Sequence, residues 1–233
     1  MTEKKKIIVL TGAGISAESG IKTFRDSDGL WENHHVQDVA TPEAWKKDKE
    51  LVTRFYNQRR SQLTEVKPNA GHLGLVELEE YFDVTIITQN VDDLHERAGS
   101  TKIIHLHGEL TKVRSSINPD LVFDWGYKEV KIGDMCEDGS QLRPHIVWFG
   151  EAVPKMGEAT LIARKSDIFI LIGSSMVVYP AAGLITEVHN NQPKYIIDPQ
   201  KPAINLDKMT TFIAEPATIG VPKLIKELKE KYI

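Results

Sequence analysis

The chain has 233 residues, of which 41% are hydrophobic and 27% charged, and its formal net charge is −4. This composition is that of an ordinary globular protein with a sizeable core, and no long run of like charge indicates a nucleic-acid partner. The single cysteine, Cys136, excludes an intramolecular disulfide and any zinc site built from several cysteines.

Membrane association is not expected either. The first residues lack the apolar stretch of a secretory signal, and no apolar run approaches the ~18 residues of a membrane span. The basic cluster at 4–6 is explained by a solvated end of the chain. We therefore expect a cytoplasmic protein whose partners are neither membranes nor nucleic acids.

Short β-branched apolar runs recur along the chain and predict strands that are buried on both faces. They cover residues 7–10, 84–88, 103–106, 146–149, 168–172 and 195–197. Helical patterns lie between or after several of them, at 42–60, 72–81, 156–164, 181–190 and 222–232. Strands that alternate with helices predict an α/β fold, a Rossmann-like doubly wound parallel sheet.

Two stretches interrupt this alternation. Residues 33–81 are polar and helix-rich, and residues 109–144 hold scattered glycines, prolines and charges. Both lie between strands of the main sheet, so we expect two insertions that pack together as a small helical and loop module. The segments 1–32, 82–108 and 145–233 then form the nucleotide-binding part of a single catalytic domain.

A glycine-rich turn follows the first predicted strand. Gly12, Gly14 and Ala17 fit the dinucleotide pattern G-x-G-x-x-G/A, and helix-compatible residues come next. Strand, tight turn and helix start in that order predict a phosphate cradle of backbone N–H groups at the positive end of a helix. A short glycine turn after a strand also occurs for purely structural reasons, and this stretch alone leaves both interpretations open.

Further polar motifs follow the other predicted strands. In a doubly wound sheet the carboxyl ends of the strands meet at one edge, where ligands bind, so these motifs are expected to face a common cleft. The motifs are Gln89–Asp92, His107, Gly150-Glu151 and Gly173-Ser174-Ser175.

Together these blocks resemble the sirtuins, a family of NAD-dependent protein-lysine deacylases. The resemblance spans roughly residues 7 to 230, and several blocks are rarely found outside that family. They are Gly12-Ala13-Gly14-Ile15-Ser16, Ser19-Gly20-Ile21, Phe24-Arg25, Gly29-Leu30-Trp31, Thr88-Gln89-Asn90-Val91-Asp92, Leu94-His95, His107-Gly108, Phe149-Gly150-Glu151 and Gly173-Ser174-Ser175.

The resemblance implies that NAD is consumed as a co-substrate. The carbonyl oxygen of an acyl-lysine protein or peptide attacks the anomeric carbon of the nicotinamide ribose, nicotinamide leaves, and the acyl group moves to ADP-ribose. His107, the residue before Gly108, takes the role of the base, and imidazole titrates near neutral pH. His105 shares its side of the strand and is expected to pack or support rather than react.

The same resemblance assigns the NAD contacts. Gln89 and Asn90 orient the ribose region, Asn90 also acting in catalysis, and Asp92 hydrogen-bonds the nicotinamide amide. An alternative is that Asn90 and Asp92 merely shape a turn and cap the next helix. The other cofactor-binding residues implied are Gly12, Ala13, Gly14, Ser16, Phe24, Arg25, Trp31, Val91, Gly173, Ser174, Ser175, Asp198 and Ala217.

Asp198 departs from the asparagine that most sirtuins carry there. A carboxylate accepts hydrogen bonds from ribose hydroxyls and disfavours a 2′-phosphate, so NAD is expected over NADP.

Tyr56 and Arg59 lie three residues apart in a predicted helix and so share a face. Without context such a pair is usually solvated. Together with Ala40, however, it resembles the class III sirtuins, in which the pair reads the acidic end of succinyl-, malonyl- or glutaryl-lysine. A guanidinium and a phenol suit a carboxylate, and the small Ala40 leaves room for the longer chain.

The substrate peptide is expected between two segments, residues 147–151, which include Val147 and Phe149, and residues 175–179, where exposed strand edges pair with an extended backbone. The alternative is that both residues are simple core positions of a strand.

The second departure from the family concerns zinc. Most sirtuins hold a structural zinc with two cysteine pairs, but residues 111–116 contain no cysteine, and Met135 and Asp138 occupy the places of the second pair. We therefore expect no zinc. Apolar packing is expected to replace it, by Val113, Ile117, Val122, Phe123 and Trp125.

Two other functions fit the same NAD site. One is an NAD glycohydrolase or ADP-ribosyltransferase, which needs no acyl pocket. The other is a non-catalytic module that binds NAD or ADP-ribose, against which the presence of Asn90, Asp92 and His107 argues. Oligomeric state, protein substrates and the ranking of the acidic acyl groups do not follow from the sequence.

Overall fold

A six-stranded parallel sheet forms the larger part of the computed structural model, which describes residues 3–22, 30–31, 34–202, 204 and 206–233. All of its neighbouring strands are parallel. In spatial order the strands are β11 (Thr210–Ile213), β10 (Lys194–Ile197), β9 (Ile168–Ile172), β1 (Lys6–Thr11), β4 (Asp83–Thr88) and β5 (Ile103–His105). The predicted Rossmann-like, doubly wound α/β fold is confirmed.

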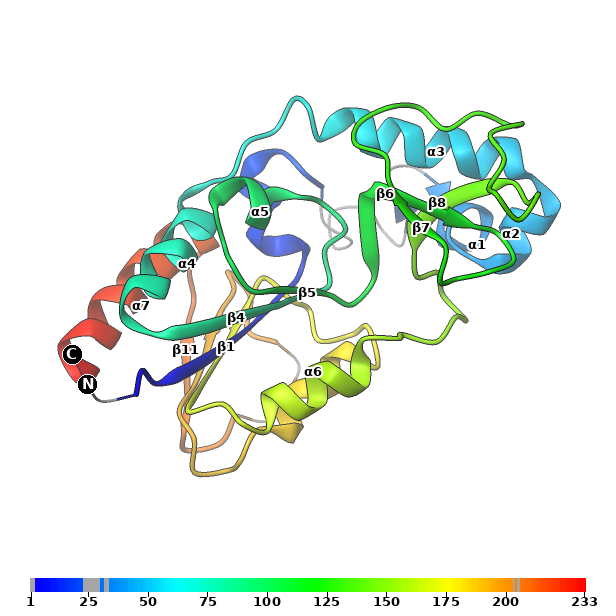
Figure 1. The fold of residues 1–233 in the computed structure, drawn as a ribbon. Helices are drawn as coiled ribbons and strands as arrows, with labels where there is room; N and C mark the ends of the chain where they lie inside the picture. Colours follow the sequence, from blue (N-terminus) through cyan, green and yellow to red (C-terminus); the bar gives the residue numbers. More distant parts are fainter. Residues whose placement is uncertain (1–2, 23–29, 32–33, 203, 205) are drawn as a thin grey trace.

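Both faces of this sheet are covered, which is why its central strands are continuously apolar. Ile7 and Val9 of β1 share a core with α4 (Ala70–Tyr81) and α7 (Ala217–Tyr232). Ile8 and Leu10 face the opposite side and share a core with α6 (Met156–Ala163) and the 3-10 helix η4 (Ala181–Glu187). Figure 1 shows α4 and α7 together on one side of the sheet and α6 on the other.

The strand register brings several strand ends together. Thr11 at the end of β1 pairs with Thr88 of β4 and Ile172 of β9, and Thr88 pairs with His105 of β5. The strand order reverses between β1 and β9, because chain connections run outward from there in both directions. Such a switch point is where doubly wound sheets bind ligands.

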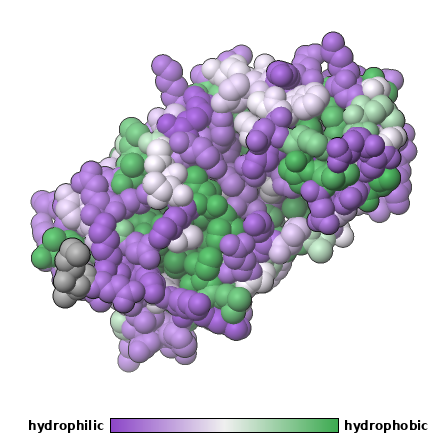
Figure 2. All heavy atoms as spheres, in the orientation of Figure 1, coloured by the Kyte–Doolittle hydropathy of each residue, from purple (hydrophilic) through white to green (hydrophobic). Residues whose placement is uncertain are grey.

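A smaller, antiparallel sheet lies beside the large one. In it β6 (Gly108–Ser115) pairs with β7 (Val122–Asp124) and β8 (Leu142–Ile146). Three helices accompany it, namely α1 (Val36–Val39), α2 (Pro42–Lys47) and α3 (Lys49–Gln62). Figure 1 shows these elements gathered at one end of the molecule, and in Figure 2 hydrophilic side chains cover most of the visible face, with hydrophobic ones exposed over both parts.

Helix boundaries follow local capping. The range 42–60, expected as one helix, divides at Asp48, which ends α2 and whose carboxylate accepts the backbone N–H of Leu51 to begin α3. The last helix begins at Ala217 and not at Pro222, which lies inside it. The expected helix at 181–190 is the 3-10 helix η4.

Three other expectations differ from the structure. Of residues 146–149 only Ile146 belongs to a strand, and that strand is β8 of the small sheet. The edge strand β11 was not predicted, because two threonines lead its four residues. Within the range 33–81, α4 packs against α7 and β4 of the large sheet, whereas α1 to α3 accompany the small one.

The small sheet has its own apolar core. Val113, Val130, Cys136 and Leu142 are buried in it, and partly buried side chains of Leu121, Phe123 and Trp125 pack around them. Ile117 and Val122 were expected there and are not, being 71% and 37% exposed. Strand alternation explains Val122, since Phe123 faces the core and its two neighbours in β7 face outward.

A polar cluster includes Ser115 and Asp138, at positions where the sequence resemblance implies zinc-binding cysteines. Asp138 accepts a hydrogen bond of 2.5 Å from Ser115 Oγ, and its other oxygen accepts the backbone N–H of Ser140. The hydroxyls of Ser115 and Ser140 are 2.9 Å apart. These bonds tie the end of β6 to the loop before β8.

We predict that the protein, purified without added zinc, contains well under one zinc per chain and that EDTA leaves its thermal midpoint unchanged, because packing and these hydrogen bonds hold the module. Elemental analysis and calorimetry make the measurement. Leu142→Ala serves as positive control and is expected to lower the free energy of unfolding by about 2–5 kcal/mol. Stoichiometric zinc, or a midpoint that falls with EDTA, contradicts the prediction.

Candidate functional site

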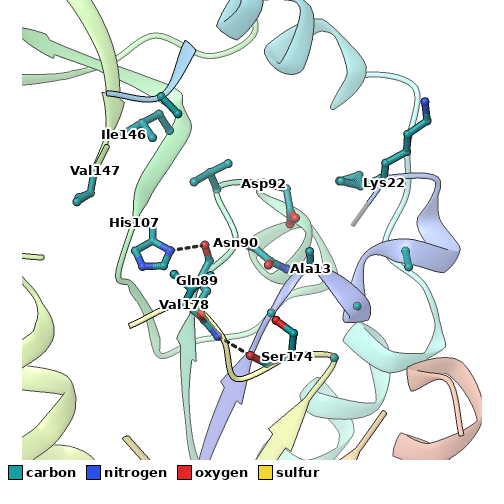
Figure 3. A pocket seen from close by; sticks show the side chains of 18 of the residues that line it. Ala13, Lys22, Gln89, Asn90, Asp92, His107, Ile146, Val147, Ser174 and Val178 are labelled. Atoms are coloured by element: carbon teal, nitrogen blue, oxygen red, sulfur yellow. Dashed lines mark hydrogen bonds between the residues drawn. The ribbon is translucent and has the colours of Figure 1, made fainter. Parts of the chain in front are cut away.

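A cavity of about 540 Å³ lies at the carboxyl edge of the large sheet and extends to the small module. This volume is in the range of ligand-binding pockets. Figure 3 shows His107 on one side of it, below Ile146 and Val147, with Ala13, Asn90 and Asp92 across from it. Sixteen of the predicted site residues line it, namely Gly12, Ala13, Gly14, Ala40, Tyr56, Gln89, Asn90, Val91, Asp92, His107, Val147, Phe149, Gly173, Ser174, Ser175 and Asp198.

The remaining predicted site residues lie elsewhere. Ser16 is fully buried beside the cavity, and Arg59 is half-buried on α3, with Cζ 5.7 Å from the ring centroid of Phe55. Ala217 is buried at the start of α7, next to Pro216, which does line the cavity. The backbone of Trp31 lies in the short strand β2 (Leu30–Trp31), paired with β3 (His34–His35), whereas Phe24 and Arg25 fall outside the described residues.

The glycine turn is shaped by contact with a second loop. Gly12 donates its N–H to Ile172, and Gly14 donates to the carbonyl of Gly173 at 2.8 Å. A Cβ on Gly14 would lie 2.5 Å from Gly173 Cα, and Gly173 has a φ of +60°. Glycines are therefore required for the close approach of these two loops.

The expected helix start after the turn differs from the structure. Two short 3-10 turns follow Gly12, at Ala13–Ile15 and Ala17–Ser19, and the second ends at Gly20 in the left-handed region. The prediction of a regular helix directly after the turn was therefore wrong, and its dipole does not act there. Backbone N–H groups of a tight turn remain the means of holding an anion at this wall.

A hydrogen bond to a backbone carbonyl holds the His107 ring in one orientation. Its Nδ1 lies 3.0 Å from the carbonyl oxygen of Gln89, drawn as a dashed line in Figure 3. A carbonyl only accepts hydrogen bonds, so the proton is on Nδ1 and the lone pair of the neutral ring is on Nε2. Burial lowers the pKa of His107, and the bond to Gln89 offsets only part of that effect.

In contrast to the surroundings of His107, those of His105 favour the charged ring. Its Nε2 lies 2.5 Å from a carboxylate oxygen of Glu96, and its Nδ1 is 3.4 Å from the carbonyl oxygen of Asn90. Both ring nitrogens face acceptors, which favours the doubly protonated ring. Burial opposes this charge, but the hydrogen bond and charge of Glu96, with that of Glu109, raise the pKa of His105 above its usual value.

Ser16 connects the two polar residues of the second motif. Its Oγ donates to Asp92 Oδ2 at 3.0 Å and accepts from Asn90 Nδ2 at 3.2 Å. Burial raises the pKa of Asp92 to about 6, with the hydrogen bonds from Leu94 and Ser16 acting in the other direction. Asp92 Oδ1 also accepts the N–H of Leu94 at the start of α5 (Leu94–Ala98). Asp92 therefore shapes this turn, as in the alternative interpretation, and also lines the cavity.

Tyr56 reaches the cavity from α3 and is otherwise buried. Its hydroxyl oxygen accepts a hydrogen bond of 3.0 Å from the indole Nε1 of Trp148. Burial raises the pKa of Tyr56, so the phenol is neutral at physiological pH.

Several lining residues were not singled out by the sequence analysis, among them Lys22 and Val153, whereas Trp148, Glu151 and Val178 were expected only as members of the two segments that border the peptide. The block Phe149-Gly150-Glu151 pointed to Glu151 but gave it no role. Trp148 has no motif of its own, because its contact depends on the packing of α3 against β8.

The Sir2 family model matches residues 12–180, and the chain belongs to this family, which confirms the predicted resemblance. A Helicobacter pylori protein is 53% identical over 97% of this chain and 98% of its own length. A Bacteroides thetaiotaomicron protein is 54% identical over 94% of this chain and 96% of its own. Both are named NAD-dependent protein deacylases.

Solved structures agree with this assignment. A point mutant of a Sir2 homologue in complex with ADP-ribose superposes with a TM-score of 0.88 at 37% identity, covering 98% of this chain and 94% of that one. A Sir2 homologue in complex with NAD gives 0.87 at 37% identity, with 98% and 91% covered. A Sir2–p53 peptide–NAD⁺ structure gives 0.76 at 30% identity, with 98% and 94% covered. Among the described residues, no helix has the length and apolarity to cross a bilayer.

We predict that the two neighbouring histidines titrate on opposite sides of pH 6.5, the ordinary value for histidine. Burial favours the neutral form of His107, so its midpoint lies below 6.5, whereas the midpoint of His105 lies above it. NMR titration of the Cε1–H resonances, assigned with His105→Asn and His107→Ala, measures both. A His107 midpoint above 6.5 contradicts the described surroundings of this ring.

Proposed function

We propose that this Sir2-family protein, an NAD-dependent protein deacylase, removes succinyl-, malonyl- or glutaryl-type acidic acyl groups from lysine side chains. NAD is its co-substrate. The observation that carries the proposal is the position of Tyr56, whose phenol lies in the wall of the cavity that also holds His107. A phenol in that wall offers a hydrogen bond to a carboxylate, a group that succinyl, malonyl and glutaryl chains carry and an acetyl group lacks.

The cavity suits NAD in size and in the character of its walls. Gly12, Gly14 and Gly173 let backbone approach a pyrophosphate closely, and Ser174 accepts a hydrogen bond from Gln89 Nε2 at 3.1 Å. Asp198 also lines the cavity, and its carboxylate supports NAD over NADP by disfavouring a 2′-phosphate. When bound, NAD supplies the ribose carbon that takes the acyl oxygen and releases nicotinamide.

His107 acts as the general base at Nε2. Its Nδ1–H is held by Gln89, its lowered pKa keeps the ring neutral at physiological pH, and it accepts the proton of a ribose hydroxyl. Asn90 and Asp92, linked through Ser16, orient the ribose and the nicotinamide amide.

The acyl-lysine is bound between His107 and the small module. Val147 donates its N–H to the carbonyl of His107 at 2.9 Å, and Phe149 donates to the carbonyl of Ala40 at 3.0 Å. The segment proposed to border the peptide is thereby attached to the base on one side and to the small residue of the acyl pocket on the other. Tyr56, which lines the cavity, then receives the acidic end of the acyl chain. Arg59 follows three residues later on the same face of α3 and does not line the cavity in this structure, and we assign its guanidinium to the same carboxylate in the substrate complex.

The test compares kcat/KM on succinyl- and acetyl-lysine versions of one peptide. We expect the wild-type protein to have the higher kcat/KM on the succinyl peptide. Arg59→Met is expected to lower kcat/KM for the succinyl peptide by a factor equivalent to about 2–4 kcal/mol, with little effect on the acetyl peptide, because a charge-assisted contact to the carboxylate is removed. Arg54→Met, at an exposed position of the same helix, is the matched control and should change neither rate.

Equal kcat/KM for the two acyl groups in the wild-type protein would refute the acidic-acyl proposal. So would an Arg59→Met variant that loses both activities in parallel.

A further inference from the structure

Glu151 lines the same cavity as Tyr56, and its side chain is 21% exposed. Burial would favour the neutral acid, but hydrogen bonds and charge from Arg143, the N–H of Trp148 and the charge of Arg114 lower its pKa, so it is ionised at neutral pH. An anion on this wall repels an acidic acyl group. The proposed substrate class therefore requires that the charge of Glu151 be more than cancelled.

Two buried arginines contact this one carboxylate. Arg143 donates from Nη1 to Oε1 at 2.8 Å and from Nη2 to Oε2 at 3.2 Å. Arg114 donates from Nη2 to the same two oxygens, at 3.3 and 3.1 Å. The side chains of Arg114 and Arg143 are only 10% and 7% exposed.

The second arginine is not needed to satisfy Glu151. Arg143 alone already bonds both oxygens in the paired geometry that a guanidinium and a carboxylate prefer. Arg114 and Arg143 are also direct cross-strand partners on β6 and β8, where two like charges destabilise a sheet. Two cations and one anion leave the cluster with a net positive charge in a poorly solvated place.

This cluster is connected to Tyr56. Glu151 Oε2 accepts the backbone N–H of Trp148 at 2.8 Å, and the Arg143 guanidinium lies 3.2 Å from the centroid of the Trp148 ring. The indole of Trp148 in turn donates to Tyr56 Oη. Arg143 lowers and Glu151 raises the pKa of Tyr56, both effects being smaller than that of burial, so the charges of these two residues reach the phenol.

We propose that Arg114 is a specificity-determining positioning residue: as the second cation on Glu151, it makes this wall of the acyl pocket net positive and admits acidic acyl groups. The inference rests on the proposed acidic-acyl activity. Arg114 does not touch the acyl group itself but acts through Glu151.

The experiment measures kcat and KM separately on succinyl- and acetyl-lysine peptides at low salt, where charge effects are least screened. Arg114→Met is expected to raise KM for the succinyl peptide about tenfold, equivalent to ~1.4 kcal/mol, with KM for the acetyl peptide changed less than about twofold. Arg114→Lys, which keeps the charge, restores most of the succinyl affinity. Lys112→Met, on the same strand but paired with Glu109, is the matched control and changes neither KM.

A double variant separates charge from structure. In Arg114→Met with Glu151→Gln, one cation remains and the anion is gone, so the net positive charge returns and the succinyl KM recovers. A purely structural role for Arg114 predicts instead that the double variant is worse than either single one, for both peptides.

Provided that the wild-type protein prefers the succinyl peptide, any of three results overturns the inference. Arg114→Met leaves the succinyl KM unchanged, it raises both KM values equally, or the double variant does not recover the succinyl KM. A wild-type protein without succinyl preference overturns the proposed function and this inference together, which distinguishes the two failures.

Discussion

Two backbone hydrogen bonds join the parts of this molecule that must act together. The N–H of Val147 binds the carbonyl of His107, and the N–H of Phe149 binds the carbonyl of Ala40. His107 follows the edge strand β5 of the large sheet, whereas Ala40 belongs to the helical insertion. The segment 147–149, proposed to border the substrate peptide, is therefore attached both to His107, the proposed base, and to Ala40 of the proposed acyl pocket.

The site is built on contrasts between neighbours of the same type. His105 and His107 are two residues apart, yet one is held by Glu96 and the other only by a carbonyl, so burial decides the charge of His107 and the carboxylate decides that of His105. Glu151 and Asp92 both line the cavity, and the pKa of one is lowered by arginines whereas that of the other is raised by burial. Local partners, rather than residue type, determine which groups can take a proton.

Much of this arrangement follows from the sequence, for identifiable physical reasons. Continuous β-branched runs predicted β1, β4, β5, β9 and β10, since only strands covered on both faces are apolar throughout. Because parallel strands end at one edge, the motifs after them were expected to meet, and Gly12, Gln89, His107 and Gly173, which follow β1, β4, β5 and β9, do line one cavity.

What the sequence left out depends on tertiary contacts. The close packing of Gly14 against Gly173, the indole bond to Tyr56 and the cluster around Glu151 each join segments far apart in the chain. No local pattern reports such contacts. Val122 was misplaced because apolar character alone does not say which side of a short edge strand faces the core, and Ile117 is exposed in the turn between β6 and β7.

The central claim is that cleavage of NAD is coupled to an acidic acyl-lysine substrate. The most direct measurement follows nicotinamide and O-acyl-ADP-ribose by mass spectrometry, with succinyl-peptide, acetyl-peptide and no peptide. We expect one O-succinyl-ADP-ribose for each nicotinamide released, with nicotinamide release fastest with the succinyl peptide and nearly absent without peptide. Nicotinamide release at the same rate without any peptide, as in an NAD glycohydrolase, would contradict it.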